Sequence, residues 1–190
     1  MLKRFFIAFI FGIFLGILIS VIIFRSLLIC PICKYEPVSL SEDQALPLTD
    51  QQYFYTVNNL LLSANKSVHI IMFEIKYYPD YPESNENRIL EALIEVKRRG
   101  VDVKIVTDEY LTDHETFNYL KSNGLDIKFD SPNRTTHSKI IIIDGKVVVV
   151  GSTNWSYYAI DKNREVNVII YSEHVAQQFE KYFEEVWQNL

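Results

Sequence analysis

The chain has 190 residues and a formal net charge of −5 at pH 7. That length accommodates one domain of ordinary size with a short appendage, and it excludes a large multidomain assembly. The first 34 residues hold four of the 19 basic residues and none of the 24 acidic ones, so the remainder is more acidic than the whole. Proteins that bind nucleic acid nonspecifically usually present a basic face, so a polyanionic substrate would have to be attracted locally.

An uncharged stretch, residues 5–24, follows Lys3 and Arg4 and precedes Arg25. A helix of this length spans about 30 Å, the thickness of a bilayer core. A cleaved signal peptide has a shorter apolar region and small residues at its cleavage site, and no such site precedes Arg25. Residues 1–34 therefore predict an uncleaved, single-pass membrane anchor. Basic residues on both flanks leave the topology open, and the free amino terminus favours a domain outside the cytoplasm.

Both cysteines lie just past this stretch, as Cys30 and Cys33. One chain offers too few thiols here for a zinc site, which needs four ligands. Incidental juxtamembrane thiols, acylation and a site shared by two chains all stay open.

A proline-containing linker is expected over residues 35–48 and a catalytic domain over residues 49–190. Two helices are expected to open with capping boxes, one at Thr49 and Gln52 and a short one at Thr112 and Glu115. Two further helices are expected over residues 86–99 and 175–187. Strands are expected over residues 68–75, 101–108, 125–129, 139–143, 146–150 and 165–171. This order predicts βαβ units with right-handed crossovers, and unbroken Ile and Val runs are typical of strands covered on both faces. The expected fold class is α/β, a mixed β-sheet sandwiched by helices.

Residues 137–154 hold a distinctive hairpin pattern. Two apolar runs flank Asp144-Gly145, and such a pair strongly predicts a two-residue turn. Side chains two apart on a strand share a face, so His137 and Lys139 should project together while the Gly-Ser-Thr-Asn segment returns beside them. An imidazole, an ammonium, an amide and a glycine-bearing loop suit an anionic, oxygen-rich group such as a phosphate.

One long spaced motif runs through this hairpin, His-x-Lys-x4-Asp-x6-Gly-Ser-x-Asn, and its positions are filled by His137, Lys139, Asp144, Gly151, Ser152 and Asn154. The motif resembles the signature of the phospholipase D superfamily, and the element order over residues 53–187 resembles that fold. Asn163-Arg164-Glu165 resembles a downstream acidic position of the family. The chain has a single copy of the motif, like the single-motif bacterial endonucleases and the membrane-anchored Zucchini-type enzymes, but it lacks the zinc-binding cysteines of the latter.

The resemblance implies a metal-independent phosphodiesterase that needs no cofactor and works through a covalent phosphohistidine. His137 would attack phosphorus, and a second His would protonate the leaving oxygen and then activate water. Because one chain supplies one such His, we expect a homodimer with a shared active site in which Lys139 and Asn154 of both chains hold the phosphate. Glu165 would orient the imidazole, although it could instead be an ordinary acid at the start of a strand.

The remaining motif residues have structural alternatives. Ser152 is expected to contact the phosphate, but it and Asn154 could merely cap the following turn. Asp144 and Gly145 are expected to shape the turn, and Gly151 the loop, rather than to act on substrate. The other histidines, His69, His114 and His174, are expected to be structural or solvent-facing, with His69 or His114 the substitute acid if the protein acts as a monomer.

The expected substrate is single-stranded nucleic acid, and two alternatives remain. Arg134, Arg164, the single motif and an aromatic rim favour a nuclease-like enzyme for single-stranded nucleic acid. The anchor and the acidic domain suit a hydrolase of membrane phospholipids instead, and a catalytically silent, membrane-anchored binding module is the third reading. The residues of the expected rim are Tyr77, Tyr78, Tyr81, Trp155, Tyr157 and Tyr158.

Overall fold

The computed structural model describes residues 13, 16, 17, 19, 20 and 44–190, and the last range lies within one compact unit. Among these described residues, no helix is long and apolar enough to cross a membrane. The anchor expected over residues 5–24 lies for the most part outside the described residues, and so do the cysteine pair and most of the linker.

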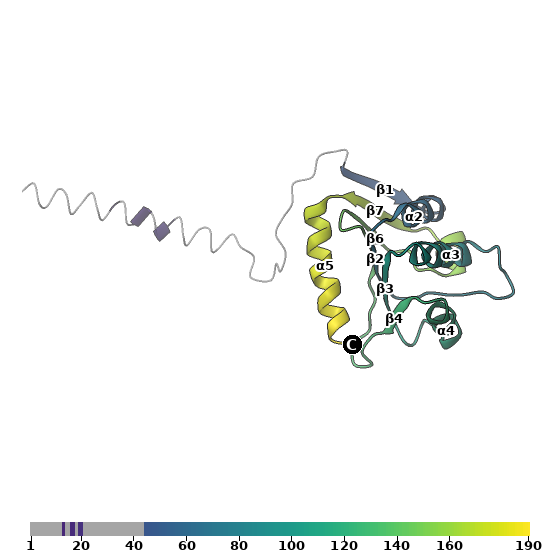
Figure 1. Cartoon of the computed structure of the whole chain (residues 1–190). Helices are drawn as coiled ribbons and strands as arrows, with labels where there is room; N and C mark the ends of the chain where they lie inside the picture. The colour runs from purple at the N-terminus through teal and green to yellow at the C-terminus, as the bar shows by residue number, and fades with distance from the viewer. Residues whose placement is uncertain (1–12, 14–15, 18, 21–43) are drawn as a thin grey trace, which may run out of the picture. The chain divides into compact units, whose positions relative to one another are not determined.

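Within residues 44–190, seven strands form one mixed sheet in the order β1-β7-β6-β5-β2-β3-β4 (Figure 1). The strands are β1 (Ala45–Thr49), β2 (Ser67–Met72), β3 (Asp102–Thr107), β4 (Asp126–Phe129), β5 (Lys139–Ile143), β6 (Val147–Gly151) and β7 (Val166–Tyr171). Strands β2, β3 and β4 run parallel to one another, and the other neighbours pair antiparallel.

Helices cover both faces of this sheet, as Figure 1 shows. One face carries α5 (Glu173–Gln188), and the other carries α2 (Gln52–Ser63), α3 (Asn85–Arg98) and α4 (His114–Ser122), with a π-helical turn η2 (Tyr158–Lys162) against α3. Ile70 and Ile71, neighbours on β2, are both buried and belong to the two different cores. The predicted mixed α/β sheet flanked by helices, with apolar strands covered on both faces, is therefore confirmed.

Two predictions at the start of the domain were wrong. Ala45–Thr49 pairs with β7 as an edge strand, so the linker does not extend to residue 48. Pro47 is tolerated there because an edge strand does not need every backbone N–H for its ladder. The N-cap of α2 is Gln51, which makes no side-chain capping hydrogen bond, so Thr49 does not open the helix.

The cap of α4 also differs from the predicted one. Asp113 is the N-cap, and its carboxylate accepts a hydrogen bond from the backbone N–H of Thr116 at 2.8 Å. Thr112 is buried instead, and its hydroxyl accepts from the backbone N–H of Ile75 at 3.0 Å and bonds the hydroxyl of Thr107 at 2.6 Å. The capping pattern found the helix but placed its start one residue early.

His69 is buried on β2 against α5. Its ring stacks on Phe183 with centroids 4.6 Å apart, and its Nδ1 and Nε2 lie 2.6 Å from Glu180 Oε2 and 3.3 Å from Asp102 Oδ2. Burial and Lys104 lower the pKa of His69, but the two carboxylates outweigh them and hold this pKa above the ordinary 6.5. The ring contacts of His69 with Glu180 and Phe183 thus tie the sheet to α5.

The stability of the domain should depend on the charge of His69. Because its pKa is raised by folding, its contribution is fully present below the unfolded-state pKa and is lost as the pH rises through the folded-state pKa. We expect His69→Gln to lower the free energy of unfolding at pH 6, and to lower it by about 1–2 kcal/mol less at pH 9. Urea unfolding followed by circular dichroism measures it, with the exposed His174→Gln as control. A loss of unfolding free energy that is independent of pH would contradict this role.

Candidate active site

The β5–β6 hairpin brings the two ends of the motif together. Its turn residues, Asp144 and Gly145, have φ values of 55° and 65°, the left-handed conformation that a two-residue hairpin turn requires. The ladder places Ile140 opposite Val150, so the start of β5 and the end of β6 meet at the same open end. The predicted hairpin is confirmed.

Asp144 holds this turn to the start of β2. Its carboxylate accepts hydrogen bonds from the backbone N–H groups of Asn65 at 3.1 Å, Lys66 at 2.7 Å and Ser67 at 3.1 Å. It lies at the closed end of the hairpin, whereas His137 and Lys139 lie at the open end. This geometry supports the structural role expected for Asp144.

Replacing Asp144 with alanine should leave three backbone donors without their carboxylate. We expect Asp144→Ala to lower the free energy of unfolding by about 2–3 kcal/mol, measured by chemical denaturation. Asp126→Ala is the matched control, because that exposed aspartate makes only a surface ion pair with Lys97 at 2.8 Å and should cost less than about 1 kcal/mol. A stable but inactive Asp144→Ala protein would point to a catalytic role instead.

His137 and Lys139 meet over one aromatic ring. Lys139 Nζ donates to the backbone oxygen of His137 at 2.8 Å and lies 3.4 Å from His137 Nε2. The ring of Phe73 lies 4.7 Å from Lys139 Nζ and 4.4 Å from the His137 ring, measured to its centroid. The imidazole is exposed while the lysine is buried, so one group faces solvent and the other is held in place beneath it.

The ammonium of Lys139 is partly removed from water. Burial lowers its pKa from the ordinary value, and the carboxylates of Glu165 and Glu74 offset part of that effect. A cation that has lost water gains more than an exposed one from an anionic partner. Lysine has three donors; one lies 2.8 Å from the His137 backbone oxygen and one 3.4 Å from His137 Nε2, so the third can hold a phosphate oxygen.

Glu165 is buried at the start of β7, and the structure brings it to Ser152. Its carboxylate accepts hydrogen bonds from the Ser152 hydroxyl and from Asn163 Nδ2, the latter at 3.1 Å. The Ser152 oxygen in turn accepts from the backbone N–H of Val166 at 3.1 Å. Within the described chain, Glu165 makes no hydrogen bond to His137 and instead acts on Lys139 through its charge. Ser152 is thus engaged in holding Glu165.

The loop between Gly151 and Asn154 is shaped by close packing. A Cβ on Gly151 would lie 2.5 Å from the Cα of Asn167, so only glycine fits. Asn167 also bonds the side chain of Thr153 at 2.8 Å and its backbone N–H at 3.3 Å. Asn154 is half-buried, and in the described structure its buried Oδ1 has no hydrogen-bond partner. A buried polar atom without a partner, at a motif residue, is a place where a hydrogen bond from substrate or water would be stabilising.

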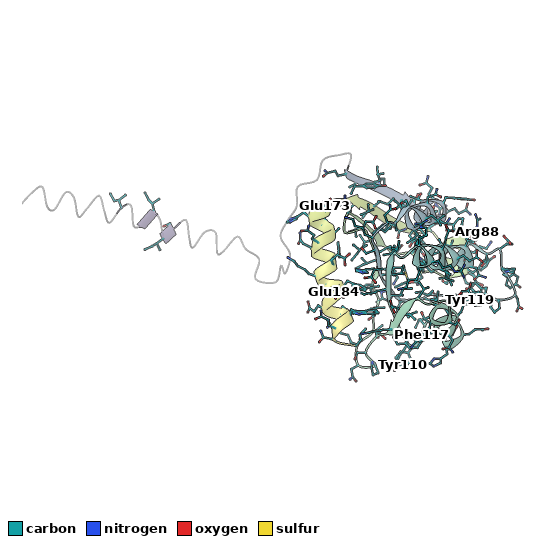
Figure 2. The ribbon with its side chains drawn as sticks, in the orientation of Figure 1. Arg88, Tyr110, Phe117, Tyr119, Glu173 and Glu184 are labelled. Carbon is teal, nitrogen blue, oxygen red and sulfur yellow. The ribbon has the colours of Figure 1, made fainter. Side chains whose placement is uncertain are left out.

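Only some of the aromatic residues that were expected around the site are exposed. Trp155 is fully buried and donates from Nε1 to the Tyr53 hydroxyl at 3.0 Å, so it belongs to the core. Tyr77 stacks on Tyr119 of α4, labelled in Figure 2, with centroids 3.7 Å apart. The other four tyrosines of the expected set line a separate cleft. Sequence patterns had missed Phe73, Glu74 and Asn167, because their roles depend on which strands pair.

Comparisons with known proteins identify the family. A family model described as "Cardiolipin synthase, PLD-like domain" matches residues 57–187. The mitochondrial cardiolipin hydrolase of Xenopus tropicalis is 30% identical over 164 residues, which cover 83% of this chain and 73% of that protein.

Two solved structures share the fold. The phospholipase D family member Nuc from Salmonella typhimurium is 27% identical with a TM-score of 0.65, covering 76% of this chain and 95% of that one. NucT from Helicobacter pylori has a TM-score of 0.64 at 20% identity, over 76% of this chain and 96% of its own. With the motif complete and the fold shared, the chain belongs to the phospholipase D-like family of phosphodiester hydrolases.

Proposed function

We propose that the protein hydrolyses phosphodiesters without a metal, with His137 as nucleophile and with one active site shared by two chains. The observation that carries the proposal is the 3.4 Å pairing of an exposed imidazole with the buried ammonium of Lys139. Because lysine has no acceptor, a hydrogen bond between these groups needs the lone pair of His137 Nε2. That lone pair is the one a nucleophile uses.

In the proposed reaction, Nε2 of His137 forms a bond to phosphorus as the bond to the leaving oxygen breaks. The partner's His137 gives its proton to that oxygen. The same imidazole then takes a proton from water, whose oxygen attacks phosphorus and breaks the bond to His137. Lys139 of each chain stabilises the charge on the phosphoryl oxygens throughout. The two imidazoles begin as equals, and the asymmetric substrate decides which of them attacks.

Phospholipid headgroup esters are the first substrate class we propose. The acidic balance of the chain disfavours a long nucleic-acid track, and residues 5–24 would hold the site at a membrane surface, where lipid substrate is concentrated. A relative named mitochondrial cardiolipin hydrolase supports the same class. Membrane attachment through residues 5–24 is part of this proposal.

Single-stranded nucleic acid is the second candidate, and one local feature favours it. Arg134 and His137 line the same pocket of about 190 Å³, together with Glu185 of α5 and Asn189, the residue that caps this helix. An exposed arginine next to the nucleophile would suit a second phosphate of a polynucleotide. Arg164 is also exposed, close in sequence to Glu165.

The test is hydrolysis by the purified full-length chain, with and without EDTA, of cardiolipin and phosphatidylglycerol vesicles, single-stranded DNA and RNA. We expect lipid hydrolysis that EDTA does not change and that His137→Ala abolishes. Cleavage of nucleic acid alone would assign the second substrate class. Loss of activity in EDTA, or no activity in a folded protein, would overturn the proposal.

A further inference from the structure

A cleft of about 870 Å³ lies between the loop that follows β2 and the turn η2. Four tyrosines line it, namely Tyr78, Tyr81, Tyr157 and Tyr158. The backbone N–H of Tyr157 donates to the Tyr78 hydroxyl at 3.2 Å, so one contact joins the two walls. The size is that of a small-molecule site.

Two of the lining tyrosines are largely exposed, so their rings are accessible from this space. Tyr81 and Tyr158 are each 69% exposed, and Tyr157 and Tyr158 meet edge to face with centroids 5.5 Å apart. The face of an aromatic ring attracts cations. The chain already uses one ring in this way, because Lys162 Nζ lies 5.1 Å from the centroid of Tyr157.

The charged side chains that line the cleft are all acidic, and Lys162, which is not a lining residue, contacts Tyr157 from outside the lining. Asp80, Glu83, Glu86 and Asp161 line it, and its lining within residues 78–161 includes no lysine, arginine or histidine. Asp161 is partly satisfied by Asn85 Nδ2 at 2.7 Å. A cleft with this lining repels phosphates and selects positive groups.

Glu86 is a buried carboxylate in the lining of the cleft. Its side chain is fully buried in the first turn of α3, and in the described structure neither carboxylate oxygen has a hydrogen-bond partner of ordinary geometry. Burial raises its pKa, and Asp161 adds to this, while its own backbone N–H and Ser84 offset only part. A buried carboxylate with no positive partner and only weak hydrogen bonds is destabilising unless a positive group meets it.

We propose that this cleft binds a small organic cation whose ammonium group lies against the tyrosine faces and is neutralised by Glu86. The ligand class is a primary or quaternary ammonium compound, either free in solution or as the headgroup of a lipid. The lining of this cleft contains none of the motif residues His137, Lys139, Ser152 and Asn154, and the proposal stands whether or not the proposed reaction is correct.

Calorimetric titration of the full-length chain with choline chloride tests the proposal. The control ligand is the neutral isostere of choline, in which a tert-butyl group replaces the trimethylammonium, with sodium chloride holding ionic strength constant. We expect saturable binding of choline and none of the isostere. Phosphatidylcholine vesicles added as competitors lower the choline signal if a lipid headgroup is the source, and leave it unchanged if a free cation is.

Two variants locate the binding. Glu86→Gln and Tyr81→Ala should each weaken choline binding by about tenfold or more. Glu95→Gln on the exposed side of α3, and Tyr110→Ala, labelled in Figure 2 and outside the cleft, should bind as wild type does. No saturable binding, equal binding of the isostere, or wild-type binding by both cleft variants would overturn the proposal.

The stability of Glu86→Gln separates binding from folding. Because the pKa of Glu86 is raised in the folded state, ionised Glu86 costs stability at neutral pH, and this cost disappears below the ordinary value of 4.5. Glu86→Gln should therefore unfold at a higher temperature than wild type near pH 7, with the gain lost in acid. A less stable variant would make Glu86 a structural residue and overturn its assigned role.

Discussion

His137→Ala is expected to lower kcat/KM for bis(p-nitrophenyl) phosphate by about a thousandfold or more. In the proposed reaction the substitution removes both the nucleophile of one chain and the proton donor of the other, and no second imidazole in the described contacts of Lys139 can replace them. A chromogenic diester is the right probe because it reports the reaction without depending on the natural leaving group.

The fold should survive this change. His137 is exposed and makes one ring contact, with Phe73, so the melting temperature should stay within about 2 °C of wild type. His174→Ala, at an exposed position of α5, should keep full activity. An active His137→Ala enzyme would show that His137 is not the nucleophile.

Lys139→Met is expected to reduce kcat by about a hundredfold to a thousandfold. Methionine keeps most of the side-chain length and the contact with Phe73, but it has no charge to stabilise the phosphoryl oxygens. Lys146→Met is the matched control, since Lys146 lies on the same hairpin, is exposed, and reaches only Glu173 at 3.3 Å.

The same substitution should make the protein more stable. The pKa of Lys139 is lowered by burial, so holding its charge costs stability at neutral pH, and that cost fades as the pH approaches the ordinary 10.5. We expect Lys139→Met to raise the melting temperature near pH 7 by about 2–5 °C. A less stable and equally active Lys139→Met protein would mean that the lysine supports the fold rather than the reaction.

Local rules explain how much of this site the sequence could predict. The Asp144-Gly145 turn and the alternation of strand side chains act over a few residues, and together they determine which ends of β5 and β6 meet. His137 and Lys139 therefore lie together as the spacing predicts. The apolar runs likewise predict strands buried on both faces, because nothing polar interrupts them.

Pairing between distant strands determines the rest. Met72 lies opposite Lys139, and this register alone brings Phe73 and Glu74 beside the lysine. Neither residue has a local pattern that marks it. Trp155 belongs to the aromatic rim that the sequence predicts, yet the tertiary packing buries it.

Long-range pairing also determines the edge strand of the sheet and the hydrogen-bond partner of Ser152. A proline-containing segment predicts a linker from local propensity, but β7 offered an unpaired edge that Ala45–Thr49 completes. Ser152 was expected to hold phosphate, and its partner Glu165 comes from the start of β7, thirteen residues along the chain. Such contacts follow from the assembled sheet.

The shared site is tested most directly by mixing wild-type and His137→Ala chains in known ratios and measuring the rate on the chromogenic diester. If each site needs an imidazole from both chains, only wild-type homodimers act, and an equal mixture retains about one quarter of the wild-type rate. Activity should then follow the square of the wild-type fraction. An equal mixture that retains about half of the wild-type rate would show that each chain acts alone, and it would contradict the account.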